Sequence, residues 1–385
     1  MKKKFFWILP VLSALFIWAC SSDSSDGPTP DDMGATDDDV VPALFDRGVM
    51  LTNWADNIIV PAYTAFSSEL SELNGAFETF SANRTVDNLV AFRAAWLEAY
   101  IAWQRVSMFE IGPAESIGYR LNINTYPTDT ALLESFVSSG SYDLSLPSNR
   151  DVKGFPALDY LLNGLETDDT ALVARFDTAG DAANRLAYVN DVLDDMIALT
   201  GQVLSEWQGG FRDSFVASDG SSATASTDRF VNDYILYYER FLRAGKMGIP
   251  LGVFTGIPAP NTIEAFYGAD VSRTLFLTGL TAVQDFFNGK HFNSSSTGQS
   301  LASYLRFLNE IKDGVALDEV INSQYNLAAE MVGSLDSFRN EIENNDPPVD
   351  MLLAYDEVQR AVALLKVDMV SALSISIDFV DADGD

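Results

Sequence analysis

Helical spacing of apolar residues is the feature that most limits what this chain can fold into. From Val41 onward nearly every segment shows that spacing, and no run alternates apolar and polar residues long enough to indicate a sheet. In Asp181–Trp207, the clearest case, Leu186 and Val189 share the apolar side of one helix. The sequence therefore predicts an all-α protein, and its 385 residues are enough to bury a large helical core.

The same spacing sets the expected helix boundaries. In the helix that begins at Thr85, Trp96, Tyr100 and Trp103 recur at i, i+4 and i+7, which predicts an aromatic stripe facing the core. The predicted helices are Val41–Asn83 with a break or kink at Pro61, Thr85–Ile111, Thr128–Ser139, Asp181–Trp207, Asp228–Met247, Thr262–Phe266, Ser272–Asn288, Gly298–Asp313, Leu317–Asn344 and Val349–Ile377.

Residues 1–19 have the pattern of an export signal. Three lysines precede an uninterrupted apolar run, which is short for a membrane span and ends at the small residue Ala19. Cys20, the only cysteine in the chain, follows directly. This arrangement is typical of a bacterial lipoprotein, so the sequence predicts an outer-membrane protein anchored in lipid through Cys20.

Residues 20–40 are predicted to form an acidic flexible tether, because their Ser, Asp, Gly and Pro leave almost nothing apolar to bury. The aspartates after Cys20 resemble the export tag of surface lipoproteins in the Bacteroidota, which predicts a surface-exposed protein. The sequence leaves the alternative of a periplasmic orientation open, and it leaves the oligomeric state open as well. The formal net charge of −31 argues against nucleic acid and anionic lipid as electrostatic partners, since both need an excess of Lys and Arg.

The stretch Gly154–Gly164, Gly-Phe-Pro-Ala-Leu-Asp-Tyr-Leu-Leu-Asn-Gly, holds the best candidate for a functional motif. Pro156 has no ligand atom, and its fixed φ suits the start of a helix. Asp159 follows near the helix N-terminus, where a carboxylate is favoured by roughly 0.3 to 1 kcal/mol. Asp159 is therefore either a partner of the helix dipole or a carboxylate that binds a ligand.

This stretch resembles the GxHxxE signature of imelysin-like proteins. Gly154 and the Tyr-Leu-Leu that follows match, but Pro156 stands where the family has histidine and Asp159 where it has glutamate. A His-x-x-Glu pair can bring an imidazole and a carboxylate to one metal ion, which Pro156 cannot do. Further segments that resemble the family are Ala95–Pro113, Ile123–Asp129 and Leu365–Asp385.

The resemblance runs from about Val41 to the C-terminus and implies two helical bundles packed as one compact body. The polar segment Ser218–Thr227 is the expected boundary, which gives an N-terminal bundle at 41–217 and a C-terminal bundle at 218–385. Ligand pockets often lie where bundles meet.

The segments that resemble the family's site hold the first group of ligand-binding candidates. Oxygen ligands suit a hard cation such as Ca²⁺ or Fe³⁺ better than zinc, and Asp159 is the candidate metal ligand. The alternative is a polar network that holds helix ends together. We expect Asp159, Tyr126 and Arg120 to face one polar cleft. The candidates are Gln104, Glu110, Arg120, Tyr126, Gly154, Pro156 and Asp159.

Glu239, Arg243 and Lys246 form a second group, because their i, i+4 and i+7 spacing puts them on one stripe of a helix. One interpretation is that the stripe binds the acidic groups of a ligand such as haem or an iron chelate, with Arg243 approaching the cleft from the second half. The other is an ordinary Glu–Arg pair on a solvated face, worth about 0.2 to 0.5 kcal/mol.

His291 is the only histidine, which excludes any site in this chain that needs two imidazoles, including the His-Glu-x-x-His zinc proteases. No Gly-x-Ser-x-Gly elbow supports a Ser-His-Asp triad. His291 lies in a polar stretch, Asn288–Ser296, and is expected to be an exposed loop residue.

Two functions are implied by the resemblance. The first is a non-catalytic, lipid-anchored binding protein linked to iron or haem uptake, with an iron species, haem or a chelate as its ligand. The second is a peptidase, the other activity attached to the family. Proline at position 156 favours binding, because it removes the family residue with an obvious route to activating water through a metal.

Overall fold

A computed structural model describes residues 44–268 and 271–379 of the chain. The predicted signal peptide, the tether with Cys20 and the end of the acidic tail lie outside these ranges. The architecture that follows belongs to the compact unit Phe45–Asp385. The predicted all-α fold is confirmed, since helices make up nearly all of its regular structure.

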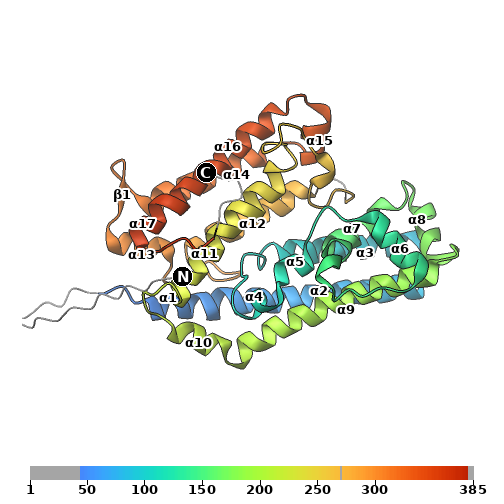
Figure 1. Ribbon diagram of the computed structural model, residues 1–385, viewed down its shortest axis with the longest axis horizontal. Coiled ribbons are helices and arrows are strands. Elements are labelled where there is room, and N and C mark those ends of the chain that lie inside the picture. The colour runs from blue at the N-terminus through green and yellow to red at the C-terminus, as the bar shows by residue number, and fades with distance from the viewer. Residues whose placement is uncertain (1–43, 269–270, 380–385) are drawn as a thin grey trace, which may run out of the picture. The chain divides into compact units, whose positions relative to one another are not determined.

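The first half of this unit is organised around α2. Its elements are α1 (Arg47–Asn53), η1 (Trp54–Ile59), α2 (Val60–Ala82), α3 (Val86–Trp103), α4 (Pro113–Ile117), α5 (Tyr119–Ile123), α6 (Thr130–Ser139), η2 (Pro147–Val152), α7 (Gly154–Asp159), η3 (Tyr160–Gly164), α8 (Asp169–Asp177), α9 (Ala182–Glu206), η4 (Trp207–Phe211) and α10 (Arg212–Ala217). α2 packs against both α3 and α9, and α7 packs against α9 (Figure 1).

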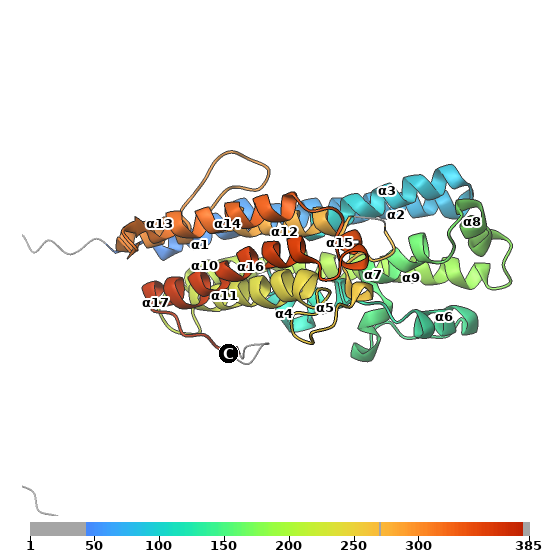
Figure 2. The same cartoon turned by 90° about the horizontal axis from the view of Figure 1, so that it is seen from above.

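The second half is organised around α14. Its elements are α11 (Ser226–Leu236), η5 (Tyr237–Gly248), η6 (Pro260–Thr262), α12 (Ser272–Phe287), α13 (Leu301–Leu308), β1 (Ile311–Lys312), β2 (Val315–Ala316), α14 (Leu317–Gly333), α15 (Phe338–Asn344), α16 (Val349–Ala363), η7 (Leu364–Met369) and α17 (Val370–Leu373). α14 packs against α12 and α16, and α12 also contacts α3 of the first half (Figure 2). The division into bundles at 41–217 and 218–385 stays a prediction.

Segments of π-helix directly follow α-helices at η1, η3, η4, η5 and η7. Their i→i+5 hydrogen bonds widen the helix, and such segments are frequent at functional sites. Pro61 lies in the first turn of α2, directly after η1, so the predicted break is a widened turn inside a continuous run of helix. The longest of these segments, η5, has 12 residues and carries three of the predicted site residues.

Several predicted helix boundaries were wrong for local reasons. The helix expected over Thr262–Phe266 is a 3₁₀ turn followed by irregular chain, in which Ala265 has a φ of 56°. The chain 309–316, expected to be helical up to Asp313, forms the β1–β2 hairpin instead. Asp313 and Gly314 have φ values of 54° and 84°, which fits a two-residue Asp-Gly hairpin turn. The expectation of no strand therefore overlooked an Asp-Gly signal.

The aromatic stripe of α3 is confirmed as core, since Trp96, Tyr100 and Trp103 are at most 2% exposed. Tyr100 stacks on Phe155 of α7 with ring centroids 4.3 Å apart, which fixes α7 against α3. In the part of the chain that the structure describes, no helix has both the length and the apolar character needed to cross a bilayer.

Candidate functional site

A largely buried polar cluster joins the two halves of the compact unit. It consists of Gln104, Asn124, Lys246 and Glu264 and is called the junction cluster here. The Nζ of Lys246 donates to Oε1 of Gln104 at 2.8 Å and pairs with Glu264. Oε1 of Glu264 also accepts from Nε2 of Gln104 at 3.2 Å and from Nδ2 of Asn124 at 2.8 Å. Each group therefore has a partner, as buried polar groups require.

Local structure sets the direction of each of these side chains. α3 ends at Trp103, and the chain turns immediately, so that Gln104 at the C-cap faces the second half. Asn124 is the C-cap of α5, and its Oδ1 accepts from the hydroxyl of Tyr100 at 2.6 Å. Lys246 comes from the last turn of η5.

The expected stripe of Glu239, Arg243 and Lys246 is split between two sites. Seven residues make nearly two whole turns of an α-helix, but they fall well short of two turns when i→i+5 bonds widen the helix. Lys246 consequently faces the junction cluster. Arg243 donates to the hydroxyl of Tyr355 at 3.1 Å, and Glu239 pairs with Lys366 at 3.0 Å.

Arg243 therefore does not approach the cleft from the second half, as the sequence suggested. Besides Tyr355, its guanidinium donates to Gln359 of α16, and its Nη2 lies 3.9 Å from Oε1 of Glu239. Both Glu239 and Arg243 are buried, so the alternative of a solvated Glu–Arg pair is also corrected. The pair links η5 to α16 and η7.

Arg120 is the centre of a second buried cluster, formed with Glu110 and Asp233. Its Nε donates to the carbonyl of Ser107 at 2.6 Å, and its Nη2 lies 3.2 Å from both carboxylate oxygens of Asp233. Its backbone N–H donates to Oε2 of Glu110 at 2.8 Å. The guanidinium carbon lies 4.5 Å from the ring centroid of Phe241, a cation–π contact from η5.

In this second cluster, burial and the oppositely charged neighbours act on each pKa in opposite directions. Burial raises the pKa of Glu110 to about 7, although Arg120 opposes the shift. Burial also raises the pKa of Asp233, again against Arg120. Burial alone would lower the pKa of Arg120, but Asp233 and Glu110 together raise it. Arg120 is therefore held as a buried cation.

A small cavity lies between the two clusters. Its volume is about 20 Å³, which is room for roughly one water molecule. Arg120 and Lys246 are the positively charged residues of its lining, and no carboxylate of the described residues belongs to that lining. The lining consists of Trp103, Gln104, Ser107, Arg120, Asn124, Tyr126, Tyr237, Phe241 and Lys246. The structure thus brings four of the predicted residues to one cavity.

Asp159 has a different position from the one expected of a first-turn acid. It is the last residue of α7, it is 2% exposed, and it does not line the cavity. Its Oδ2 accepts from the backbone N–H of Tyr267 at 2.9 Å, and its Oδ1 from Nδ2 of Asn163 at 3.1 Å. Asp159 therefore fastens the first half to the loop that precedes α12.

Gly154 and Pro156 are both buried in α7. Gly154 begins the helix with a φ of 69°, and Pro156 is its third residue. Within residues 44–268 and 271–379, no group of three or more His, Cys, Asp or Glu side chains is placed to hold a metal ion. His291 is half-buried, so the expectation of an exposed loop residue was wrong.

Glu264, Asn124 and Asp233 were not predicted as site residues from the sequence. A signal for Glu264 existed, because it is the only charged residue between Lys246 and Gly268. A lone carboxylate in such an apolar stretch has to be exposed or paired. Its partners, however, lie up to 160 residues away in the chain.

The burial of Asp159 gives a pH dependence that can be measured. Burial raises its pKa to about 7, against the hydrogen bonds from Tyr267 and Asn163. A carboxyl with a raised pKa in the folded state binds its proton more tightly there, so its effect on stability becomes less favourable as pH rises from about 4 to about 7, by about 1.4 kcal/mol per unit at most. The stability of Asp159→Asn relative to the parent protein should therefore improve over that range, as measured by urea unfolding.

The matched control for this pH series is Glu72→Gln, which alters an exposed carboxylate on α2. Its difference from the parent protein should stay nearly constant with pH. A constant difference for Asp159→Asn as well would show that the Asp159 carboxylate is solvated.

Comparison with known proteins places these features in a family context. The family model described as Imelysin (Peptidase M75) matches residues 59–367. Iron-regulated protein A of Synechococcus elongatus is 29% identical over 113 residues, which are 29% of this chain and 30% of that protein. The chain is therefore aligned with less than a third of that relative's length.

Solved structures share the fold at low sequence identity. A candidate iron-regulated protein A precursor from Parabacteroides distasonis has a TM-score of 0.68 and 16% identity, over 88% of this chain and 98% of that one. An imelysin-like protein from Psychrobacter arcticum has a TM-score of 0.66 and 16% identity, over 87% of this chain and 97% of that one.

Proposed function

This chain belongs to the imelysin family, and on that premise we propose that it is a lipid-anchored, non-catalytic binding protein of the cell envelope that takes part in iron or haem uptake. The link to iron is supported by the name of the relative, iron-regulated protein A. The anchor is supported by Cys20 and the apolar run before it. In cell fractionation, Cys20→Ser should move the protein from the outer membrane to a soluble fraction, and an unchanged location would contradict the anchor.

The observation that carries the binding proposal is the cationic cavity between the junction cluster and Arg120. Arg120 and Lys246 line it, and their acidic partners Asp233 and Glu264 lie outside the lining. The other polar groups are neutral amides, phenols, a hydroxyl and the indole of Trp103. Such a lining favours an anionic oxygen over a bare metal ion, because it offers N–H and O–H donors to an oxygen acceptor but no carboxylate to hold a metal. The proposed ligand is therefore an iron chelate or haem that presents a carboxylate.

The size of the cavity limits how such a ligand binds. Since about 20 Å³ accepts one water-sized group, only a carboxylate oxygen enters. The rest of the ligand lies outside, over the half-buried side chains of Asn124 and Tyr126. The Tyr126 hydroxyl stays protonated as a donor, because burial raises its pKa well above the usual value.

The non-catalytic part of the proposal is supported by α7. Pro156 supplies no group for acid–base chemistry or for metal binding at the position of the family's histidine. Asp159, at the position of the family's glutamate, is already engaged by Tyr267 and Asn163. If this protein were a peptidase, residues outside α7 would have to activate the attacking water molecule.

The proposal is tested by calorimetry with ferric citrate, haem and calcium chloride on the full-length protein. Ferric citrate or haem should bind, and Tyr126→Phe should weaken binding on the order of tenfold by removing one hydrogen bond to a charged group. Arg240→Gln, an exposed substitution on the same helix as Lys246, should leave the affinity unchanged.

Two results would contradict the proposal. The first is binding of calcium but of neither iron compound, with the affinity lost in Asp159→Asn, which would show a carboxylate-held cation. The second is cleavage of an unfolded protein that Asp159→Asn abolishes, which would show the peptidase alternative.

A further inference from the structure

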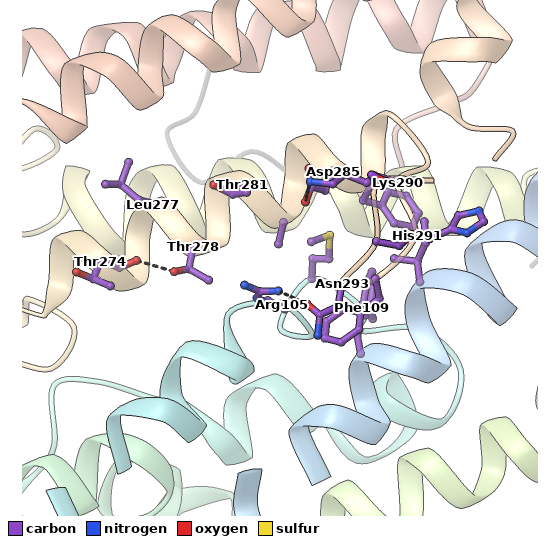
Figure 3. A pocket seen from close by; sticks show the side chains of 18 residues that line it. Arg105, Phe109, Thr274, Leu277, Thr278, Thr281, Asp285, Lys290, His291 and Asn293 are labelled. Atoms are coloured by element: carbon purple, nitrogen blue, oxygen red, sulfur yellow. Dashed lines mark hydrogen bonds and ion pairs between the residues drawn. The ribbon is translucent and has the colours of Figure 1, made fainter. Parts of the chain in front are cut away.

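A pocket in the described part of the chain lies apart from the small cavity between the junction cluster and Arg120, which is called the junction cavity here. Its volume is about 560 Å³, within the range of small-molecule sites. One wall is α12, a second is the chain after α3 from Arg105 to Phe109, and a third is η1 with the start of α2. The loop 290–295 closes one end (Figure 3).

The body of this α12 pocket is apolar. Ile58, Phe109 and Phe286 are buried in its floor, and Leu277 of α12 is half-buried at its side. Thr274, Thr278 and Thr281 line the same side of α12, at the i, i+4 and i+7 positions of an α-helix (Figure 3). The pocket thus offers apolar contact and a row of neutral hydroxyls.

The charges in the pocket leave one cation without an acidic partner. The Nζ of Lys290 lies 3.1 Å from both carboxylate oxygens of Asp285, so these two charges neutralise each other. Arg105 donates from Nη1 to Oδ1 of Asn293 at 2.9 Å and forms no ion pair with any Asp or Glu in the described residues. Figure 3 shows its guanidinium directed at Asn293, beside the apolar floor.

Hydrogen bonds within the protein hold the loop 290–295 that closes the pocket. The backbone N–H of Phe292 donates to the carbonyl of Asn57 at 2.8 Å, and that of His291 to Ser296 at 2.9 Å. The Nδ2 of Asn53 donates to the carbonyl of Gly289 at 3.1 Å. These bonds hold Asn293 beside Arg105, so ligand binding costs little conformational entropy in this loop.

We propose that the α12 pocket binds an organic monocarboxylate with an apolar body, such as a fatty acid. The planar guanidinium of Arg105 matches the geometry of a carboxylate. A single unpaired positive charge matches one negative charge better than the nearly two of a phosphate monoester. The acyl chain would lie over Ile58 and Phe109 toward Leu277.

The test uses decanoate and its uncharged counterpart decan-1-ol, titrated calorimetrically into the full-length protein. Decanoate should bind, and Arg105→Gln should weaken it on the order of tenfold, as expected for loss of a charge-assisted hydrogen bond. Arg105→Gln should leave decan-1-ol unchanged. Ala282→Trp, which fills the pocket from α12, should abolish binding of both.

The control is again Arg240→Gln, which removes an exposed arginine that does not line this pocket. Thermal unfolding should be unchanged in Arg105→Gln, since Arg105 is exposed. Equal affinity of the parent protein and Arg105→Gln for decanoate would overturn the proposal, and so would undetectable binding of decanoate to the parent protein.

Discussion

Lys246→Met is expected to lower the free energy of unfolding by about 3 to 5 kcal/mol, the usual cost of removing one partner from a buried ion pair. Lys246 and Glu264 are 4% and 1% exposed. Without Lys246, the Glu264 carboxylate keeps only the amide donors of Gln104 and Asn124, and its charge is uncompensated. Urea unfolding at neutral pH measures the loss.

The double variant Lys246→Met with Glu264→Gln should recover much of this stability. Glutamine keeps an oxygen that accepts from Gln104 and Asn124, and no charge is then buried. The surface pair of Arg229 and Glu115, each about half exposed, is the matched control. Arg229→Met should cost no more than about 1 kcal/mol. If Lys246→Met also cost no more than about 1 kcal/mol, the junction cluster would be solvated.

Gly154→Ala is expected to be similarly damaging, with a loss of about 2 to 5 kcal/mol from left-handed strain and overpacking combined. Gly154 has a φ of 69°, and a Cβ there would lie 2.1 Å from the carbonyl oxygen of Ile123. Since that oxygen belongs to the backbone at the end of α5, relief requires moving the chain next to Asn124. The loss should appear in urea unfolding, together with weaker binding at the junction cavity.

The control for Gly154→Ala is Gly201→Ala in the exposed middle of α9, where an added Cβ meets nothing within 4 Å. There, alanine should stabilise the protein by about 0.5 to 1 kcal/mol, because it restricts the unfolded chain and favours helix. If both substitutions had the same small effect, α5 and α7 would not be packed as closely as the structure shows.

Repeated helical spacing determined the all-α fold, because a helix that buries one face must repeat its apolar residues with the period of its turns. The same logic identified the aromatic stripe of α3 as core. The resemblance in Ala95–Pro113 and Ile123–Asp129 led to Gln104 and Tyr126, which meet at one cavity together with Arg120 from the chain between these segments. Proline at position 156, where the family has histidine, was by itself a reason to doubt that this chain has the family's peptidase chemistry.

The tertiary structure decided which charges face one another. An i, i+4, i+7 pattern puts residues on one stripe only if the turns are α-helical. In the π-helical turns of η5, Lys246 faces the junction cluster and Arg243 faces α16. Glu264 and Asp159 each have, besides nearer partners, at least one partner more than a hundred residues away along the chain. Such contacts leave no local periodicity, because they depend on how whole helices pack and on the cost of burying each charge unpaired.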